Sequence, residues 1–250
     1  MLSKLVATFS SITPLPGYAA TKVLGGHLRG KTLYMPQCEH LSYMLGRYEP
    51  HIVDVLAEHL EPGMVCYDVG AHIGYLSLTM SQLVGDEGKV ISFEASPTNY
   101  PALKANIETN QMENMTAIHK AVSNQPEMVR FATFEYSLVG HIATDDTPAD
   151  GKIEEVEAVS LDDCVFNQGF QPPDLIKIDV EGAEVKVFNG MLETLRFHRP
   201  VVLAEVRDLY MEPLADIANR YDYEIEILQG NWDLEEDGLV DLLMRPKEGR

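Results

Sequence analysis

The chain has 250 residues, of which 45% are hydrophobic and 23% charged, and its formal net charge is −20. This length and composition are typical of one globular domain with a sizeable core. The acidic balance disfavours binding to phosphate backbones and to anionic membranes, because the few basic residues form no dense cluster. No nucleic-acid partner is therefore expected.

The cysteines and the start of the chain indicate a compartment. Cys38, Cys66 and Cys164 lie far apart without metal-ligand spacing, which favours reduced thiols over a disulfide framework. The first apolar stretch is interrupted by Ser10 and followed by Pro14, which fits neither a signal peptide nor a membrane span. We therefore expect a soluble, cytoplasmic protein, whose oligomeric state the sequence leaves open.

The chain divides into a weakly patterned lead segment, residues 1–48, and a domain over residues 49–250. The first helix of the domain begins at Pro50 and ends before Pro62-Gly63. Residues 135–152 are predicted to form a polar loop that selects the substrate. The remaining pattern predicts, in order, strand 64–69, helix 73–84, strand 89–93, helix 99–110, strand 115–122, strand 128–134, strand 175–180, helix 183–195, strand 201–206, helix 210–219 and an antiparallel pair, 223–228 with 239–244.

Strands that alternate with helices of this length predict an α/β fold, with a mostly parallel central sheet and helices on both faces. Right-handed crossovers bring the carboxyl ends of parallel strands to one edge, where ligands bind. The site is therefore expected in the loops that directly follow residues 69, 94, 122, 180 and 206.

A glycine turn, Asp68-Val69-Gly70-Ala71-His72-Ile73-Gly74, follows the first of these strands. Gly70 permits a sharp turn, Gly74 permits close packing of the next helix, and the free N–H groups there suit an anionic group. A dinucleotide pyrophosphate requires a glycine where His72 stands, so the spacing favours S-adenosylmethionine over NAD. Glu94 ends the second strand, 24 residues after Gly70, where its carboxylate can accept both ribose hydroxyls.

These residues resemble the FkbM-type methyltransferases. The likeness runs from roughly Glu49 to Glu205 and is most specific at residues 176–184. It implies a class I methyltransferase (Rossmann-like) fold and transfer of a methyl group to a hydroxyl of a sugar, polyketide or related metabolite. The segments that carry it are Asp68–Gly74, Phe93-Glu94, Ala121-Val122-Ser123 and Ile176-Lys177-Ile178-Asp179-Val180-Glu181-Gly182-Ala183-Glu184.

The resemblance also implies positions for the cofactor: the glycine turn lines the methionine end, Glu94 the ribose and Ala121 the adenine side. The chain departs from the family at His72, where asparagine is common, and at Ala95, where proline is common. The first departure bears on cofactor contacts and the second on local stiffness. The expected cofactor-binding residues are Asp68, Gly70, His72, Gly74, Glu94, Ala95, Ala121 and Asp179.

Acidic residues follow the next two strands at the expected mouth. Methyl transfer to an alcohol needs alignment with the donor and a group that makes the hydroxyl more nucleophilic. Asp179 and Glu181 are the catalytic candidates, and Glu205 ends the neighbouring strand. Two interpretations stay open: one carboxylate is a general base, or all three bind Mg²⁺, which lowers the hydroxyl pKa.

Other functions also stay open. They are a methyltransferase that acts on protein or RNA, a nicotinamide-dependent oxidoreductase, and a binding protein that keeps the pocket without turnover. The acidic charge argues against RNA, and His72 in place of a glycine argues against the oxidoreductase. The sequence does not identify the methyl acceptor, and it does not decide whether a metal is needed.

Overall fold

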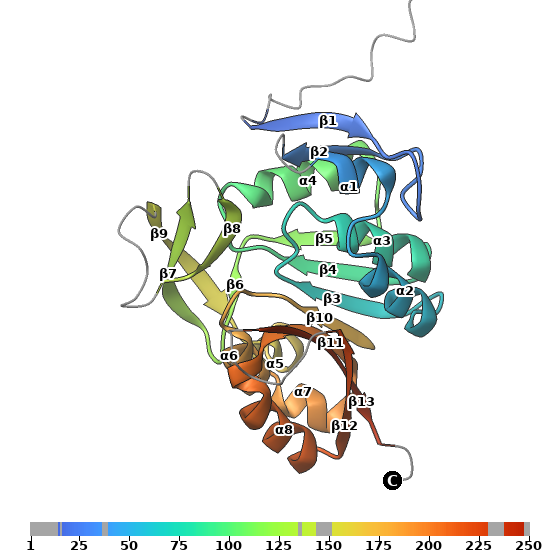
Figure 1. Cartoon of the computed structure of the whole chain (residues 1–250). Coiled ribbons are helices and arrows are strands. Elements are labelled where there is room, and N and C mark those ends of the chain that lie inside the picture. The colour runs from blue at the N-terminus through green and yellow to red at the C-terminus, as the bar shows by residue number, and fades with distance from the viewer. Residues whose placement is uncertain are drawn as a thin grey trace, which may run out of the picture.

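The computed structural model describes residues 15, 17–36, 40–134, 137–143, 152–229 and 238–247. The strands of its central sheet are β3 (Val65–Val69), β4 (Lys89–Phe93), β5 (Met115–Ile118), β10 (Leu175–Ile178), β11 (Val201–Arg207), β12 (Tyr223–Gln229) and β13 (Leu239–Pro246). Their order is β12-β13-β11-β10-β3-β4-β5 (Figure 1). Neighbours run parallel except that β13 is antiparallel to both β11 and β12. The predicted α/β fold with a mostly parallel sheet is confirmed.

Helices cover both faces of this sheet because side chains alternate along each strand. In β3, Val65 and Tyr67 join one hydrophobic core and Cys66 the other. The first core contains the helices of the carboxyl-terminal half of the chain, α5 (Leu161–Phe166), α6 (Glu184–Asn189), α7 (Leu192–Phe197) and α8 (Met211–Arg220). The second contains α2 (Pro50–His59), α3 (Tyr75–Val84) and part of α4 (Asn99–Thr109).

The single helix predicted over residues 183–195 is wrong, because α6 and α7 are separate. The chain turns at Gly190, where a Cβ atom would lie 2.2 Å from the backbone oxygen of Ser123. Helix α6 therefore ends against the neighbouring loop, and α7 starts in a new direction. Among the described residues, no helix has the length and apolarity needed to cross a lipid bilayer.

A second, four-stranded sheet of order β6-β9-β7-β8 stands beside the carboxyl ends of the parallel strands (Figure 1). Its strands are β6 (Ala121–Val122), β7 (Glu127–Phe134), β8 (Ser137–Ile142) and β9 (Lys152–Val159). The strand predicted over residues 115–122 is thus two strands in different sheets. The loop predicted over 135–152 is wrong where β8 pairs with β7, and residues 144–151 lie outside the described residues.

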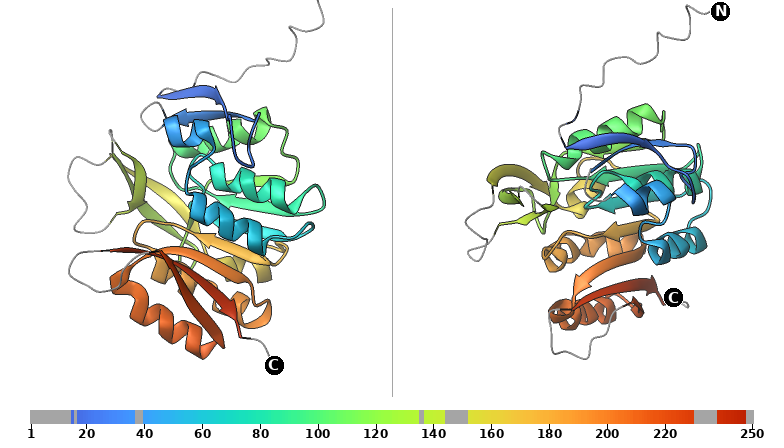
Figure 2. Two further views of the ribbon diagram at one scale, coloured as in Figure 1. Left: turned by 45° about the vertical axis from the view of Figure 1, so that its right-hand side comes forward. Right: turned by 45° about the horizontal axis from the view of Figure 1, so that its top comes forward.

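Within the lead segment, β1 (Tyr18–Lys22) and β2 (Thr32–Pro36) form an antiparallel hairpin, followed by α1 (His40–Leu45). The hairpin lies on α4 (Figure 2). Leu28, Leu33 and Met35 are fully buried in the same core as α2 and α3. The hairpin and α1 therefore share a hydrophobic core with the larger domain.

Candidate active site

A cavity of about 580 Å³ lies where the sequence predicts it, at the carboxyl ends of β3, β4 and β10. Most of the predicted site residues line it: Gly70, His72, Glu94, Ala95, Ala121, Asp179 and Glu181. Three others do not line it: Asp68 is buried beside Lys177, Gly74 packs against Leu103, and Glu205 is half-buried next to Asp179 and Glu181. A cavity of this volume is in the range of small-molecule and cofactor sites.

Gly70 brings two of the predicted loops into contact. Its φ of +84° is left-handed, and a Cβ atom there would lie 1.7 Å from the backbone oxygen of Asp179. The amide of Asp179 donates to the carbonyl of Val69 at 2.9 Å, so the loops after β3 and β10 are bonded directly. Behind them, a Cβ atom on Gly74 would lie 2.5 Å from Leu103 of α4. Both glycines are needed for close approach, as the sequence predicts.

The carboxylate of Glu94 hydrogen-bonds to the backbone of the glycine turn. Its side chain is buried, with Oε2 accepting a hydrogen bond from the His72 amide and Oε1 from the Ser96 amide, both at 2.7 Å. Burial raises the pKa of Glu94 to about 7, although the two backbone N–H groups act in the opposite direction. Each carboxylate oxygen keeps a second lone pair for a ligand hydroxyl.

Beneath the turn lies a buried ion-pair cluster that sequence patterns did not reveal. Lys177 Nζ is 3.0 Å from Asp179 Oδ2 and 3.9 Å from Asp68 Oδ1, and Asp68 also accepts a hydrogen bond from Ser77. Burial lowers the pKa of Lys177, but the two carboxylates raise it more, so the lysine stays charged. Strand register causes this arrangement, because Lys177 and Asp68 are directly opposite each other on β10 and β3.

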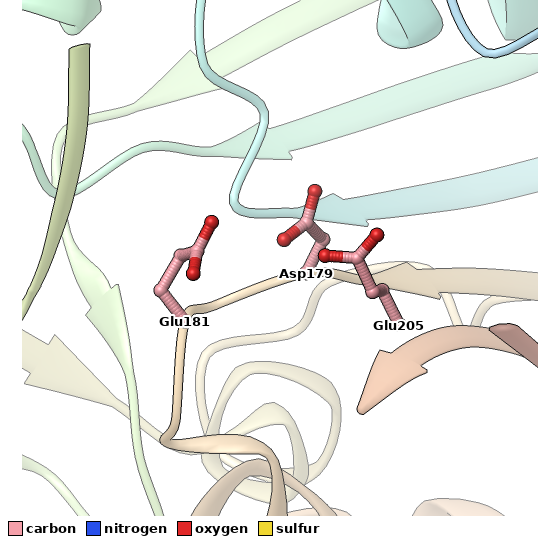
Figure 3. Close-up of side chains that lie close together, drawn as sticks. All are labelled: Asp179, Glu181 and Glu205. Atoms are coloured by element: carbon pink, nitrogen blue, oxygen red, sulfur yellow. The ribbon is translucent and has the colours of Figure 1, made fainter. Parts of the chain in front are cut away.

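The three carboxylates proposed from the sequence come together. Carboxylate oxygens of Asp179, Glu181 and Glu205 lie within 4.8 Å of one another; the first two stand on the loop after β10 and the third on β11 (Figure 3). Burial, Asp179 and Asp241 raise the pKa of Glu205 to about 8. Burial and Asp179 also raise the pKa of Glu181, whose backbone is left-handed at φ +54°. The site is therefore rich in negative charge.

Sequence reasoning missed several parts of the wall: Leu41 and Ser42 enter it from the amino-terminal segment, and Phe131 enters it from β7. Tyr48 also lines the cavity, and so does Ile142, from within the segment 135–152 predicted to select the substrate. The Tyr48 ring stacks on Tyr43, with centroids 4.2 Å apart. No local motif marks these positions, because only the packing of distant elements brings them to the cavity.

The fold occurs in known methyltransferases. The crystal structure of methyltransferase FkbM from Methylobacillus flagellatus matches with a TM-score of 0.51 and 16% identity, covering 77% of this chain and 50% of that chain. The strand order, the reversed β13 and the glycine-turn cavity at the strand ends give this chain the class I methyltransferase fold.

The chain belongs to the FkbM methyltransferase family, whose domain model matches residues 68–235. It is 25% identical over 150 residues to hexuronic acid methyltransferase AglP of Haloferax volcanii, covering 60% of this chain and 59% of that protein. It is 26% identical over 181 residues to 31-O-demethyl-FK506 methyltransferase FkbM of Streptomyces tacrolimicus, covering 60% and 68%. The chain thus matches about three-fifths of the length of the Haloferax relative, and the predicted family resemblance is confirmed.

Proposed function

We propose that the protein transfers a methyl group from S-adenosylmethionine to a hydroxyl of a small molecule or glycan. One observation carries this proposal: the glycine turn with Glu94 and the acidic pair Asp179 and Glu181 line the same cavity. A nucleoside cofactor seated between Gly70 and Glu94 places its reactive end beside the two acids. When bound, S-adenosylmethionine supplies an activated methyl group on a sulfonium.

Glu181 is the proposed general base. It lines the cavity, and its raised pKa gives it more affinity for a proton than an exposed glutamate has. Asp179 is already paired with Lys177, which holds it as a fixed hydrogen-bond acceptor that orients the hydroxyl. Glu205 does not line the cavity, and with a pKa of about 8 it is mostly protonated at neutral pH. Glu181 would take the proton of the acceptor hydroxyl as its oxygen forms the new bond to the methyl carbon, while the carbon–sulfur bond of the sulfonium would break and S-adenosylhomocysteine would leave.

The charge of the cavity favours an uncharged acceptor. Asp179 and Glu181 stand in the wall, and Lys177, which is shared between Asp179 and Asp68, compensates only part of their charge. At an effective dielectric constant of about 20, like charges about 6 Å apart repel by roughly 3 kcal/mol. Although one relative is named for hexuronic acid, we propose a neutral sugar or polyketide hydroxyl for this chain. Mg²⁺ at the three carboxylates is the second candidate role for this cluster.

A matched pair of acceptors tests this proposal. Methyl glucoside and methyl glucuronide carry the same ring hydroxyls at positions two, three and four, and only the second carries a carboxylate. The two compounds, together with a wider pool of neutral hydroxylated metabolites, are incubated with the protein and isotopically labelled S-adenosylmethionine. We expect the label to appear in neutral acceptors. We also expect kcat/KM to be at least about tenfold lower for an acidic acceptor than for its neutral counterpart. If no hydroxyl group became labelled, O-methyl transfer would be contradicted. A higher kcat/KM for the acidic acceptor would contradict the charge argument.

A separate measurement distinguishes the metal from the general base. Loss of turnover in EDTA, restored by Mg²⁺, would favour the metal interpretation over the base.

Glu94→Ala is expected to weaken cofactor binding by at least roughly tenfold, measured by calorimetry with S-adenosylmethionine. The variant removes the acceptor for ribose hydroxyls and also frees the His72 amide, which shapes the turn. Glu108→Ala, at an exposed position on α4, is the control and should bind as the wild type does. Unchanged affinity in Glu94→Ala would show that the ribose is held elsewhere.

A further inference from the structure

Side-chain amides of α4 hydrogen-bond to the backbone of β2 at the edge of the amino-terminal hairpin, where a third strand would otherwise pair. Asn110 accepts from the Thr32 amide at 3.0 Å and donates to the Thr32 carbonyl at 2.7 Å. Asn106 accepts from the Tyr34 amide at 2.6 Å and donates to the Tyr34 carbonyl at 3.2 Å. The two asparagines thus satisfy the backbone of two alternate residues on the outer edge of β2.

Asn106 makes one bond that Asn110 does not. Its Nδ2 also donates, at 2.8 Å, to the carbonyl of Ile73, which lies inside the glycine turn between His72 and Gly74. Asn106 is fully buried, so no water can replace the amide without repacking. The turn is therefore held from two sides, by Glu94 at the His72 amide and by Asn106 at the Ile73 carbonyl.

The hairpin reaches the cavity by a second route as well. The hydroxyl of Tyr18 donates to Oδ1 of Asn99 at 2.7 Å, and Asn99 is buried and lines the cavity. Helix α4 thus presents Asn99 to the cavity, Leu103 to Gly74 and Asn106 to the turn, while its other contacts hold the hairpin. Residues 18–36 precede the segment that matches the family model, residues 68–235.

We propose that Asn106 is a positioning residue that couples docking of the amino-terminal hairpin to the shape of the cofactor turn. The inference rests on the proposed function, because it takes the turn at Gly70–Gly74 as the cofactor seat. Coupling of this kind is reciprocal, so cofactor binding stabilises the docked hairpin and the docked hairpin favours cofactor binding.

The test compares Asn106→Ala with Asn110→Ala. Each variant removes two bonds to the edge of β2, and only the first also frees the Ile73 carbonyl. We expect Asn106→Ala to raise the Kd and KM for S-adenosylmethionine about tenfold, with kcat at saturating cofactor unchanged within about threefold. Asn110→Ala should leave both constants within about twofold, although both variants lower Tm. Equal shifts in the two variants, or none in Asn106→Ala, would overturn the inference.

Amide exchange in the wild type gives a measurement that does not depend on the variants folding. Cofactor should slow exchange at the Thr32 and Tyr34 amides more than at amides of the distant β12–β13 pair, and equal or absent slowing at the hairpin would overturn the coupling. If the wild type bound no cofactor, the proposed function would fall. Exchange at the amides of residues 72–75 in the two variants would then still decide whether Asn106 holds the turn.

Discussion

Lys177→Met is expected to lower the free energy of unfolding by about 3–5 kcal/mol at pH 7. The side chain is buried between Asp68 and Asp179, and methionine fills a similar volume without charge. Its loss leaves buried carboxylate charge without a partner, which costs far more than the loss of an exposed ion pair. For a domain of this size, Tm should fall by roughly 6–20 °C in thermal unfolding.

The pH dependence of this loss distinguishes uncompensated charge from poor packing. Burial already raises the pKa of Asp68, and removal of the lysine raises it further, so acid neutralises the stranded carboxyl. The difference in the free energy of unfolding between wild type and Lys177→Met should therefore decrease as pH falls from about 8 to about 5. Lys89→Met, at an exposed position at the start of β4, should stay within about 0.5 kcal/mol of the wild type. A loss below about 1 kcal/mol in Lys177→Met, or a difference independent of pH, would contradict the ion-pair account.

Glu181→Gln is expected to reduce kcat by roughly 10²–10⁴ while the Kd for S-adenosylmethionine changes less than about threefold. The amide keeps the size and a hydrogen-bond acceptor but cannot take the hydroxyl proton. Glu205→Gln is the matched control, because it changes a carboxyl group of the same cluster that does not line the cavity. It should keep at least about a tenth of kcat. The base would be misassigned if Glu205→Gln lost more activity than Glu181→Gln.

The pH profile gives an independent check on the same residue. The base acts when deprotonated, so wild-type kcat should fall as pH drops through the raised pKa of Glu181, above the usual glutamate range. Glu205→Gln replaces a carboxyl group that is already protonated in this pH range, so it should leave the acidic limb in place. Glu181→Gln should abolish the limb. An identical limb in all three proteins would assign it to another group.

Local patterns were sufficient for the part of the site that follows individual strands. The turn at Gly70–Gly74, Glu94 and the acids at positions 179 and 181 each lie directly after an apolar run. Gly70 and His72 of the turn line the cavity, as do Glu94 and both acids. Such positions can be predicted because a parallel sheet collects its strand ends at one edge, whatever the lateral order of the strands. The second sheet was harder, since β8 lies within the polar segment 135–152 and the adjacent Glu154 and Glu155 break the alternation of β9.

Local patterns predict the α/β alternation, the edge of the sheet that carries the cavity, and the glycines and acids at that edge. Which side chains meet follows from the packing of distant segments. The register of β10 on β3 sets Lys177 beside Asp68, and the docking of β2 on α4 gives Asn106 its bonds to Tyr34 and Ile73. Periodicity reports on neighbours a few residues apart, whereas these contacts join segments separated by tens of residues, and only the packing of the whole chain selects them.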